Sequence, residues 1–241
     1  MKVGMMKSSL SLLCIGFVSA ASLFSVSNSW AEEAPTFLAE RGKLLLSEDF
    51  SGGDGWTRPK GKWEAAGGVL RGDEKPEDKH GAVSRHKIEL KDAVIQVGVR
   101  LDGCKTATLS INDSKGHLCR LLIRPTGFTV QKDDHDHAGP DKAVVFQTVE
   151  TPVGAGVWHT FSLEMVGNEL LGSMDGKHIG FGAHDAIRTP KADLGLTVSG
   201  QGASFKALRI WEATKNPGWE ATKSKLPAPE SPAAVGRKKG V

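Results

Sequence analysis

The chain contains 241 residues, of which 24% are charged and 39% are hydrophobic, and its formal net charge is +3. This composition is ordinary for a folded globular protein, and the charge falls to +1 once Lys2 and Lys7 near the N-terminus are left out. A nearly neutral chain gives no electrostatic basis for nucleic acid as a partner. The 29 glycines favour strands and turns, because glycine destabilises the interior of a helix.

Residues 1–31 have the pattern of a secretory signal peptide. A basic start is followed by an apolar stretch at 10–24, and residues 29–31 supply small side chains for cleavage. The stretch is short for a membrane span, so we expect export to the periplasm or the cell exterior, with no membrane attachment after cleavage. Cys14 leaves a lipoprotein signal as the alternative, although Leu13 before it is larger than the residue that lipidation requires.

The rest of the chain divides into three parts. Residues 32–44 are expected to form a linker, and residues 45–213 a single domain. Residues 214–241 are rich in Lys, Pro and Ala, bury too little apolar surface to fold alone, and are expected to form a disordered tail. Inside the domain, apolar and polar residues alternate with the period of a β-strand, most clearly at 93–101, 107–111, 119–123, 161–165 and 194–198.

No segment of the domain has a convincing helical pattern, and Asp175-Gly176 is a strong hairpin signal. About a dozen antiparallel strands must form two packed sheets to bury their apolar residues. The predicted fold is therefore all-β, a two-sheet antiparallel jelly-roll sandwich, and the protein is expected to be a monomer. Cys104 and Cys119 are expected to be buried free thiols, with a disulfide in an oxidising compartment as the alternative.

The alternation also predicts a polar sheet face. If odd-numbered residues fill the core, the opposite face carries Gln96, Arg100, Thr108, Ser110 and Arg120, joined from a later strand by Thr160, Ser162 and Glu164. Such donors and acceptors suit the hydroxyl groups of a carbohydrate, which is the expected partner. The alternative is an ordinary solvent-facing sheet surface.

Three further positions extend this hypothesis. His80 and Arg85 lie in a strand that would border the same cleft. Trp56 is the candidate for an exposed aromatic side chain that stacks on a sugar ring, with a core position as the alternative.

Arg120 and His117 carry the chemistry of the predicted site. Arg120 lies between apolar residues in mid-strand, so it needs a carboxylate partner, Asp102 or Glu164, or a ligand. His117 at the entrance of that strand is a candidate acid or base, with a hydrogen-bonding turn histidine as the alternative. Residues 133–137 resemble a metal-binding sequence but are interpreted as a polar surface loop, and neither a metal nor another cofactor is expected.

Four segments in order resemble the 3-keto-disaccharide hydrolase family, also described as the 3-keto-glucoside lyase/hydratase domain. They lie at 63–72, 156–161, 167–177 and 192–210, and the resemblance covers roughly residues 46–213. It implies a concanavalin-like jelly roll that acts on 3-keto-glycosides. In that case His117 or Glu164, near Arg120, would move the proton beside the ketone or cleave the glycosidic bond.

The sequence also departs from that family and from related enzymes. Residues 94–100 contain no carboxylate before Asp102, and residues 197–202 lack the usual acid/base residues. No convincing pair of carboxyls for glycoside cleavage is found. These departures keep two alternatives open, a non-catalytic carbohydrate-binding module and a structural or protein-interaction domain.

Overall fold

The computed structural model describes Met1 and residues 33–52, 55–135 and 138–229. The predicted signal peptide at 1–31 therefore lies outside the described residues, except for Met1. Within the described ranges, no helix is long and apolar enough to cross a membrane.

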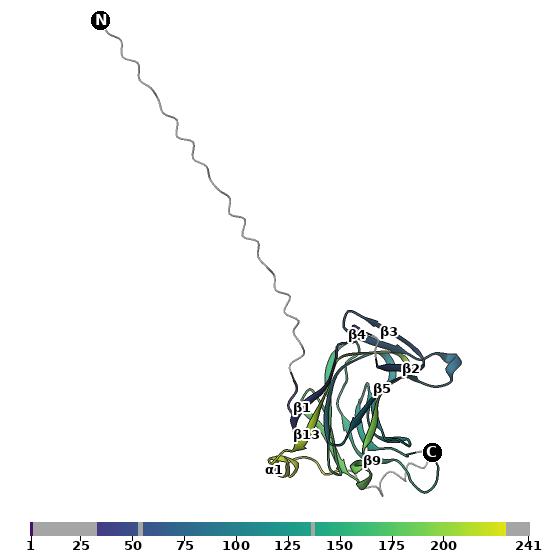
Figure 1. The fold of residues 1–241 in the computed structure, drawn as a ribbon, viewed down its shortest axis with the longest axis vertical. Coiled ribbons are helices and arrows are strands. Elements are labelled where there is room, and N and C mark those ends of the chain that lie inside the picture. The colour runs from purple at the N-terminus through teal and green to yellow at the C-terminus, as the bar shows by residue number, and fades with distance from the viewer. Residues whose placement is uncertain (2–32, 53–54, 136–137, 230–241) are drawn as a thin grey trace. The chain divides into compact units, whose positions relative to one another are not determined.

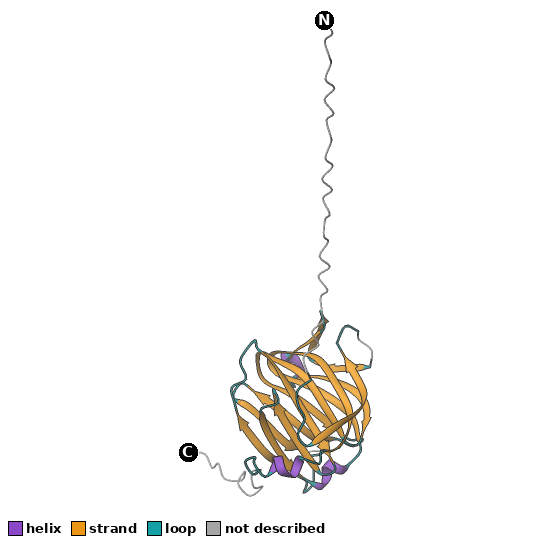
Figure 2. Ribbon diagram, turned by 90° about the vertical axis from the view of Figure 1, so that its left-hand side faces the viewer, coloured by secondary structure: helices purple, strands orange, loops and turns teal. Residues whose placement is uncertain are grey.

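The described chain forms thirteen strands, and every strand pairing is antiparallel. The strands are β1 (Ala39–Glu48), β2 (Trp56–Lys60), β3 (Lys62–Ala66), β4 (Val69–Asp73), β5 (Ala82–Leu90), β6 (Ala93–Asn112), β7 (His117–Arg124), β8 (Gly127–Lys132), β9 (Val144–Glu150), β10 (Trp158–Val166), β11 (Glu169–Met174), β12 (His178–Ala183) and β13 (Lys191–Lys215). The helices are short: η1 (Pro76–Asp78), η2 (Asp185–Arg188) and α1 (Trp219–Lys223). Figure 2 shows strands covering the domain, with the helices at its periphery.

The strands form two layers that share β6 and β13. The first layer has the order β12-β11-β10-β6-β13, with β1 and β4 beside β13. The second has the order β9-β8-β7-β6-β13-β5-β2. Figure 1 shows β1 beside β13 in the first layer and β5 in the second. This confirms the predicted two-sheet antiparallel sandwich.

The two long strands bend where they pass between the layers. Their register shifts around Gly103 and Gly200, which have φ angles of +100° and +88°. Residues with side chains rarely adopt this conformation, so glycine allows the bend at both positions. As a result, the two halves of β6 belong to different layers although the strand is continuous.

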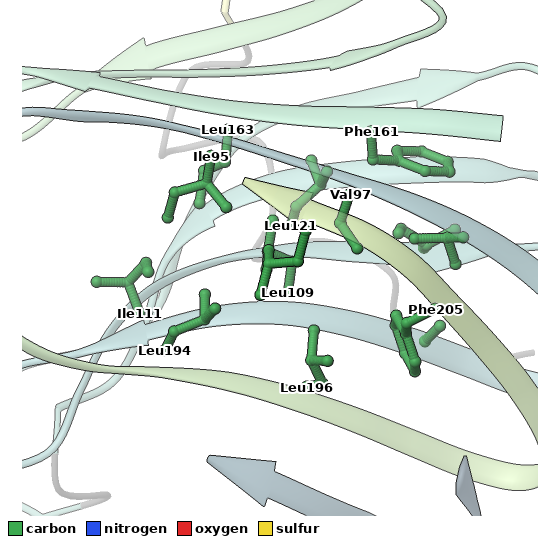
Figure 3. Close-up of a cluster of buried hydrophobic side chains, with 14 of the residues drawn as sticks. Ile95, Val97, Leu109, Ile111, Leu121, Phe161, Leu163, Leu194, Leu196 and Phe205 are labelled. Carbon is green, nitrogen blue, oxygen red and sulfur yellow. The ribbon is translucent and has the colours of Figure 1, made fainter. Parts of the chain in front are cut away.

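The core fills the space between the layers with the residues that the alternation predicts to face inward, odd-numbered on β6, β7 and β10 and even-numbered at 194–198 of β13. Figure 3 shows Ile95, Phe161 and Leu163 of the first layer close to Leu109 and Leu121 of the second. All five side chains are at most 1% exposed. Burial of each such side chain stabilises the folded state by about 1.5–3 kcal/mol. The contact between the two layers is therefore a main source of the stability of the fold.

The folded part extends beyond both expected boundaries of 45–213. Strand β1 begins at Ala39, inside the expected linker, because residues 39–48 pair with the end of β13. At the other end, Trp219 of α1 is fully buried against Leu38 and Phe181, inside the expected tail. The alternation of apolar and polar residues did not reveal either segment. Each adds only a few apolar residues to a layer that is formed mainly by other strands.

Two local predictions are confirmed. Asp175 and Gly176 both have positive φ angles, 52° and 60°, in the turn between β11 and β12. Cys104 and Cys119 are buried free thiols. Burial raises the pKa of Cys104 to about 11 and that of Cys119 to about 12, so both thiols stay protonated at neutral pH.

Candidate functional site

A polar cavity of about 210 Å³ opens on the outer face of the second layer, the face turned away from the core. Four of the predicted site residues line it, Thr108, Ser110, His117 and Arg120. The remaining lining residues are His80, Val83, Arg85, Gly195 and Thr197. Both His80 and Arg85 line this cavity, Arg85 from β5 and His80 from the segment just before that strand.

Strand register explains why these residues meet. Arg85, Gly195, Ser110 and Arg120 are successive cross-strand partners on β5, β13, β6 and β7. Val83, Thr197 and Thr108 form the neighbouring row on the same strands. Since alternate residues of a strand point to the same side, both rows present their side chains to one face.

Arg120 is held by a buried carboxylate beside the cavity. Its Nε donates to Asp133, at 2.6 Å from Oδ1 and 2.7 Å from Oδ2, and the Asp133 side chain is only 1% exposed. Gln131 donates to the same carboxylate at 2.8 Å. The sequence suggested Asp102 or Glu164 as the carboxylate partner of Arg120. The partner in the structure is Asp133 instead.

A hydrogen-bonded chain orients His117. Asn112 Nδ2 donates to Oδ1 of Asp193 at 2.5 Å, which points the amide oxygen of Asn112 toward His117. The Nδ1–H of His117 donates to that oxygen at 2.8 Å. In the neutral imidazole the proton is then on Nδ1, and Nε2 carries the lone pair that accepts a proton.

The base of the cavity consists of small, mostly buried groups. Ser110 is 7% exposed, and its hydroxyl donates to the carbonyl of Gly195 at 3.2 Å. A Cβ atom on Gly195 would approach the Ser110 hydroxyl to 2.5 Å. Glycine therefore keeps the space between Arg85 and Arg120 open.

A second cavity of about 570 Å³ adjoins the first and shares His117 with it. Its lining includes His135, whose Nε2 donates to Asp113 at 2.8 Å, and Lys132, which pairs with Asp141. Burial raises the pKa of Asp113, but the hydrogen bonds from His135 and two backbone N–H groups outweigh it and hold the pKa below its usual range. Both carboxylates of this cavity are thus already engaged by basic side chains.

Gln96, Arg100 and Glu164 lie on the other side of the sandwich. The even-numbered residues of β6 were expected to share one face, but β6 passes from the first layer to the second. The outer faces of the two layers point in opposite directions, so Gln96 and Arg100 are separated from Thr108 and Ser110. The prediction that all these polar residues share one sheet face was therefore wrong.

Glu164 is fully buried under the N-terminal segment and does not line the cavity. Its carboxylate accepts hydrogen bonds from the backbone N–H groups of Phe37 and Ala39, at 3.0 and 2.9 Å. Burial raises its pKa to about 7, against the opposing effect of these hydrogen bonds and of Arg41. Gln96 similarly donates to the carbonyl of Ala34 at 2.7 Å. Both residues therefore fasten the segment that precedes β1.

Arg100 and Trp56 also have structural partners. Arg100 pairs with Asp102 at 2.7 Å and lies 4.9 Å from the ring centre of Trp158. Trp56 is only 8% exposed, packs on Phe50, and donates through Nε1 to Glu48 at 3.0 Å. Trp56 is thus a core residue, the alternative considered above.

Several members of the site were not predicted from the sequence. Asp133 was assigned to a surface loop, yet it follows the end of β8 on the same face as Gln131, the cross-strand partner of Arg120. Counting outward from the turn at Pro125 and Thr126 would have found it. Asn112, Asp193 and Thr197 carry no such signal, because their proximity depends on the pairing of β6 with β13, about eighty residues apart. Among the described residues, no three His, Cys, Asp or Glu side chains form a metal-binding group.

Comparison with solved structures identifies the fold. A carbohydrate-binding module, CBM66 from Bacillus subtilis, superposes with a TM-score of 0.54 at 17% identity, covering 66% of this chain and 96% of the module. A prokaryotic β-1,3-1,4-glucanase (lichenase) from a mouse hindgut metagenome gives 0.54 at 13% identity, covering 71% and 99%. SCLam, a non-specific endo-β-1,3(4)-glucanase of family GH16, gives 0.53 at 12% identity, covering 77% and 98%. At these identities the likeness shows a shared jelly-roll fold.

No protein-family model matches the sequence, and no curated protein matches it. The resemblance to 3-keto-disaccharide hydrolases therefore has no support from these two comparisons.

Proposed function

We propose that this is an exported carbohydrate-binding protein that holds a saccharide in the 210 Å³ cavity of the second layer. The observation that carries the proposal is the pair of cross-strand rows that bring two arginines and three hydroxyl side chains to one recess, whose lining also includes two histidines. Sugars present many hydroxyl groups, and several oriented donors and acceptors are needed to fix them. Pockets for drug-sized ligands measure roughly 300–1,000 Å³, so this smaller cavity suits a single sugar unit.

Binding is better supported than hydrolysis. None of the nine residues that line the cavity is Asp or Glu, whereas most glycosidases place two carboxyl groups across the scissile bond. Asp133 and Asp193, the carboxylates that pair with Arg120 and Arg85 of the lining, accept hydrogen bonds from Arg120 and Asn112. The solved structures with this fold include both a binding module and glucanases, which is consistent with a sugar ligand. The choice between binding and hydrolysis therefore depends on the residues of the cavity.

A second candidate function is cleavage of 3-keto-glycosides, favoured by the chain from Asp193 through Asn112 to His117. A ketone acidifies the hydrogen on the neighbouring carbon. Nε2 of His117 would remove that proton, and a guanidinium N–H of Arg120 would stabilise the enolate oxygen that forms. Collapse of the enolate would break the adjacent glycosidic C–O bond, and the protonated His117 would return its proton to the leaving oxygen. The chain from Asp193 would keep the imidazole in the tautomer that this step requires.

Calorimetric titration with methyl glucoside, cellobiose and laminaribiose, preceded by a glycan array, tests the first proposal. We expect saturable binding that weakens about fivefold to tenfold in Thr197→Val, which removes one hydroxyl at nearly constant volume. Thr160→Val, on β10 of the first layer, is the matched control and should bind normally. Absence of binding to every saccharide, or equal loss in both variants, rejects the proposal.

The catalytic candidate needs a separate assay. Incubation with a 3-keto-disaccharide should release the aglycone sugar in the native protein and lose that release in His117→Gln, while saccharide binding persists. Turnover that survives this substitution excludes the role given to His117.

A further inference from the structure

The two arginines of the cavity lie on the same cross-strand row, with small residues between them. From Arg85 on β5, the row passes through Gly195 and Ser110 to Arg120 on β7. Three strand spacings separate the two arginine backbones, which is roughly 14 Å. Two long side chains at this separation can both reach a group that is bound above Gly195 and Ser110.

Every ionisable side chain that lines the cavity is basic. These side chains are His80, Arg85, His117 and Arg120. An arginine offers only hydrogen-bond donors, and a ligand that faces two of them needs acceptor atoms.

Neither arginine is fully used by its carboxylate partner. Arg120 binds Asp133 through Nε, so the N–H groups of Nη1 and Nη2 remain for another acceptor. Arg85 Nη1 lies 3.8 Å from Asp193, beyond hydrogen-bond distance, and its side chain is 40% exposed. Asp133 itself is buried below the arginine, so the surface that a ligand meets is the cationic side of the pair.

We propose that the sugar unit bound in this cavity carries an anionic substituent, the carboxylate of a hexuronic acid or a sulfate ester, held between Arg85 and Arg120. This rests on the proposed saccharide-binding function and specifies its ligand class. Such a substituent is an acceptor only, which matches the donor-only guanidinium groups, whereas a neutral hydroxyl also brings a hydrogen that needs an acceptor. The hydroxyls of Thr108 and Thr197 remain to bind the ring hydroxyls, and the oxygen of Ser110, whose hydrogen is donated to Gly195, remains as an acceptor.

Calorimetric titration compares glucuronic acid, glucose 6-sulfate and methyl glucoside at low and at physiological salt. At least one charged sugar should bind ten or more times more tightly than methyl glucoside, with an affinity that falls as salt rises. The better of the two charged sugars identifies the substituent. Sodium acetate and sodium sulfate are titrated alone, because equal affinity for these salts would mean an adventitious ion only and would overturn sugar recognition.

Variants separate the arginine effect from general folding. Arg85→Gln should abolish the preference for the charged sugar, Arg85→Lys should keep part of it, and Arg188→Gln on η2 should have no effect. Circular dichroism melting checks that each variant is folded. If methyl glucoside binds as tightly as both charged sugars, the anionic ligand is excluded while the binding function stands. If no sugar of either kind binds, the proposed function fails as well.

Discussion

The Nε atom of Arg120 lies 2.6 Å from a carboxylate oxygen of Asp133 that is almost completely shielded from solvent. The pair joins the strand that carries the cavity to the segment following β8. Replacement of Arg120 by Met would leave a buried negative charge without its partner, and such groups are strongly destabilising. We expect the free energy of unfolding to fall by about 2–3 kcal/mol.

Urea denaturation of Arg120→Met measures this loss. Arg124→Met is the control, since Arg124 is exposed on the same strand and should cost about 0.5 kcal/mol or less. Equal losses in the two variants would show that Asp133 does not depend on Arg120.

Glu164 should make stability depend on pH. Its pKa is raised to about 7 in the folded protein from an ordinary value of 4.5, so the folded state holds this proton more tightly than the unfolded state. The resulting stabilisation is complete below about pH 4.5 and is lost as pH rises through about 7. Over this window the loss amounts to about 3 kcal/mol.

The side chain at position 164 cannot ionise in the Glu164→Gln variant. The free energy of unfolding of this variant, relative to that of the native protein, should therefore rise by this amount between pH 4.5 and pH 8. Urea denaturation at several pH values measures the difference. Glu212→Gln, an exposed carboxyl on β13, serves as the control and should track the native protein. A constant difference between native protein and Glu164→Gln would mean that Glu164 is ionised throughout.

Trp219 should contribute strongly to the stability of the fold, because it packs α1 against the outer face of the first layer. It is fully buried, contacts Phe181 edge to face at 5.4 Å between ring centres, and donates through Nε1 to Glu169 at 2.9 Å. Trp219→Ala should cost about 3–5 kcal/mol in thermal or urea unfolding. Ala221→Ser, at an exposed position of the same helix, is the control and should change the free energy of unfolding little. A small effect of Trp219→Ala would show that this segment does not contribute to the stability of the fold.

The two cysteines should be inert in the folded protein. Their raised pKa values and burial leave almost no thiolate for reaction. A thiol reagent such as DTNB should label neither Cys104 nor Cys119 until urea unfolds the protein, and should then label both. Labelling at low urea would reveal local opening at the named cysteine.

Much of the fold could be predicted from the sequence because strand alternation is a local property. The buried residues of β6, β7 and β10 follow from counting every second position, and the turn at Asp175-Gly176 follows from backbone preference. Four members of the candidate site followed as well, since Thr108, Ser110, His117 and Arg120 lie on the two strands of one hairpin. His80 and Arg85 were also expected beside the cleft, whereas Gly195 and Thr197 of β13 join it only through long-range strand pairing, which no local pattern encodes.

Strand alternation in the sequence fixes which side chains of each strand face the core and which face away from it. Which outer face a residue joins, and whether another segment covers that face, depends on how distant strands pack together. Gln96 and Ser110 have the same parity on one strand, yet the bend near Gly103 places them on opposite outer faces, and the segment before β1 then buries Gln96 and Glu164. The physical reason is that alternation fixes a direction relative to the strand, whereas the course of the strand and its covering depend on contacts between distant parts of the chain.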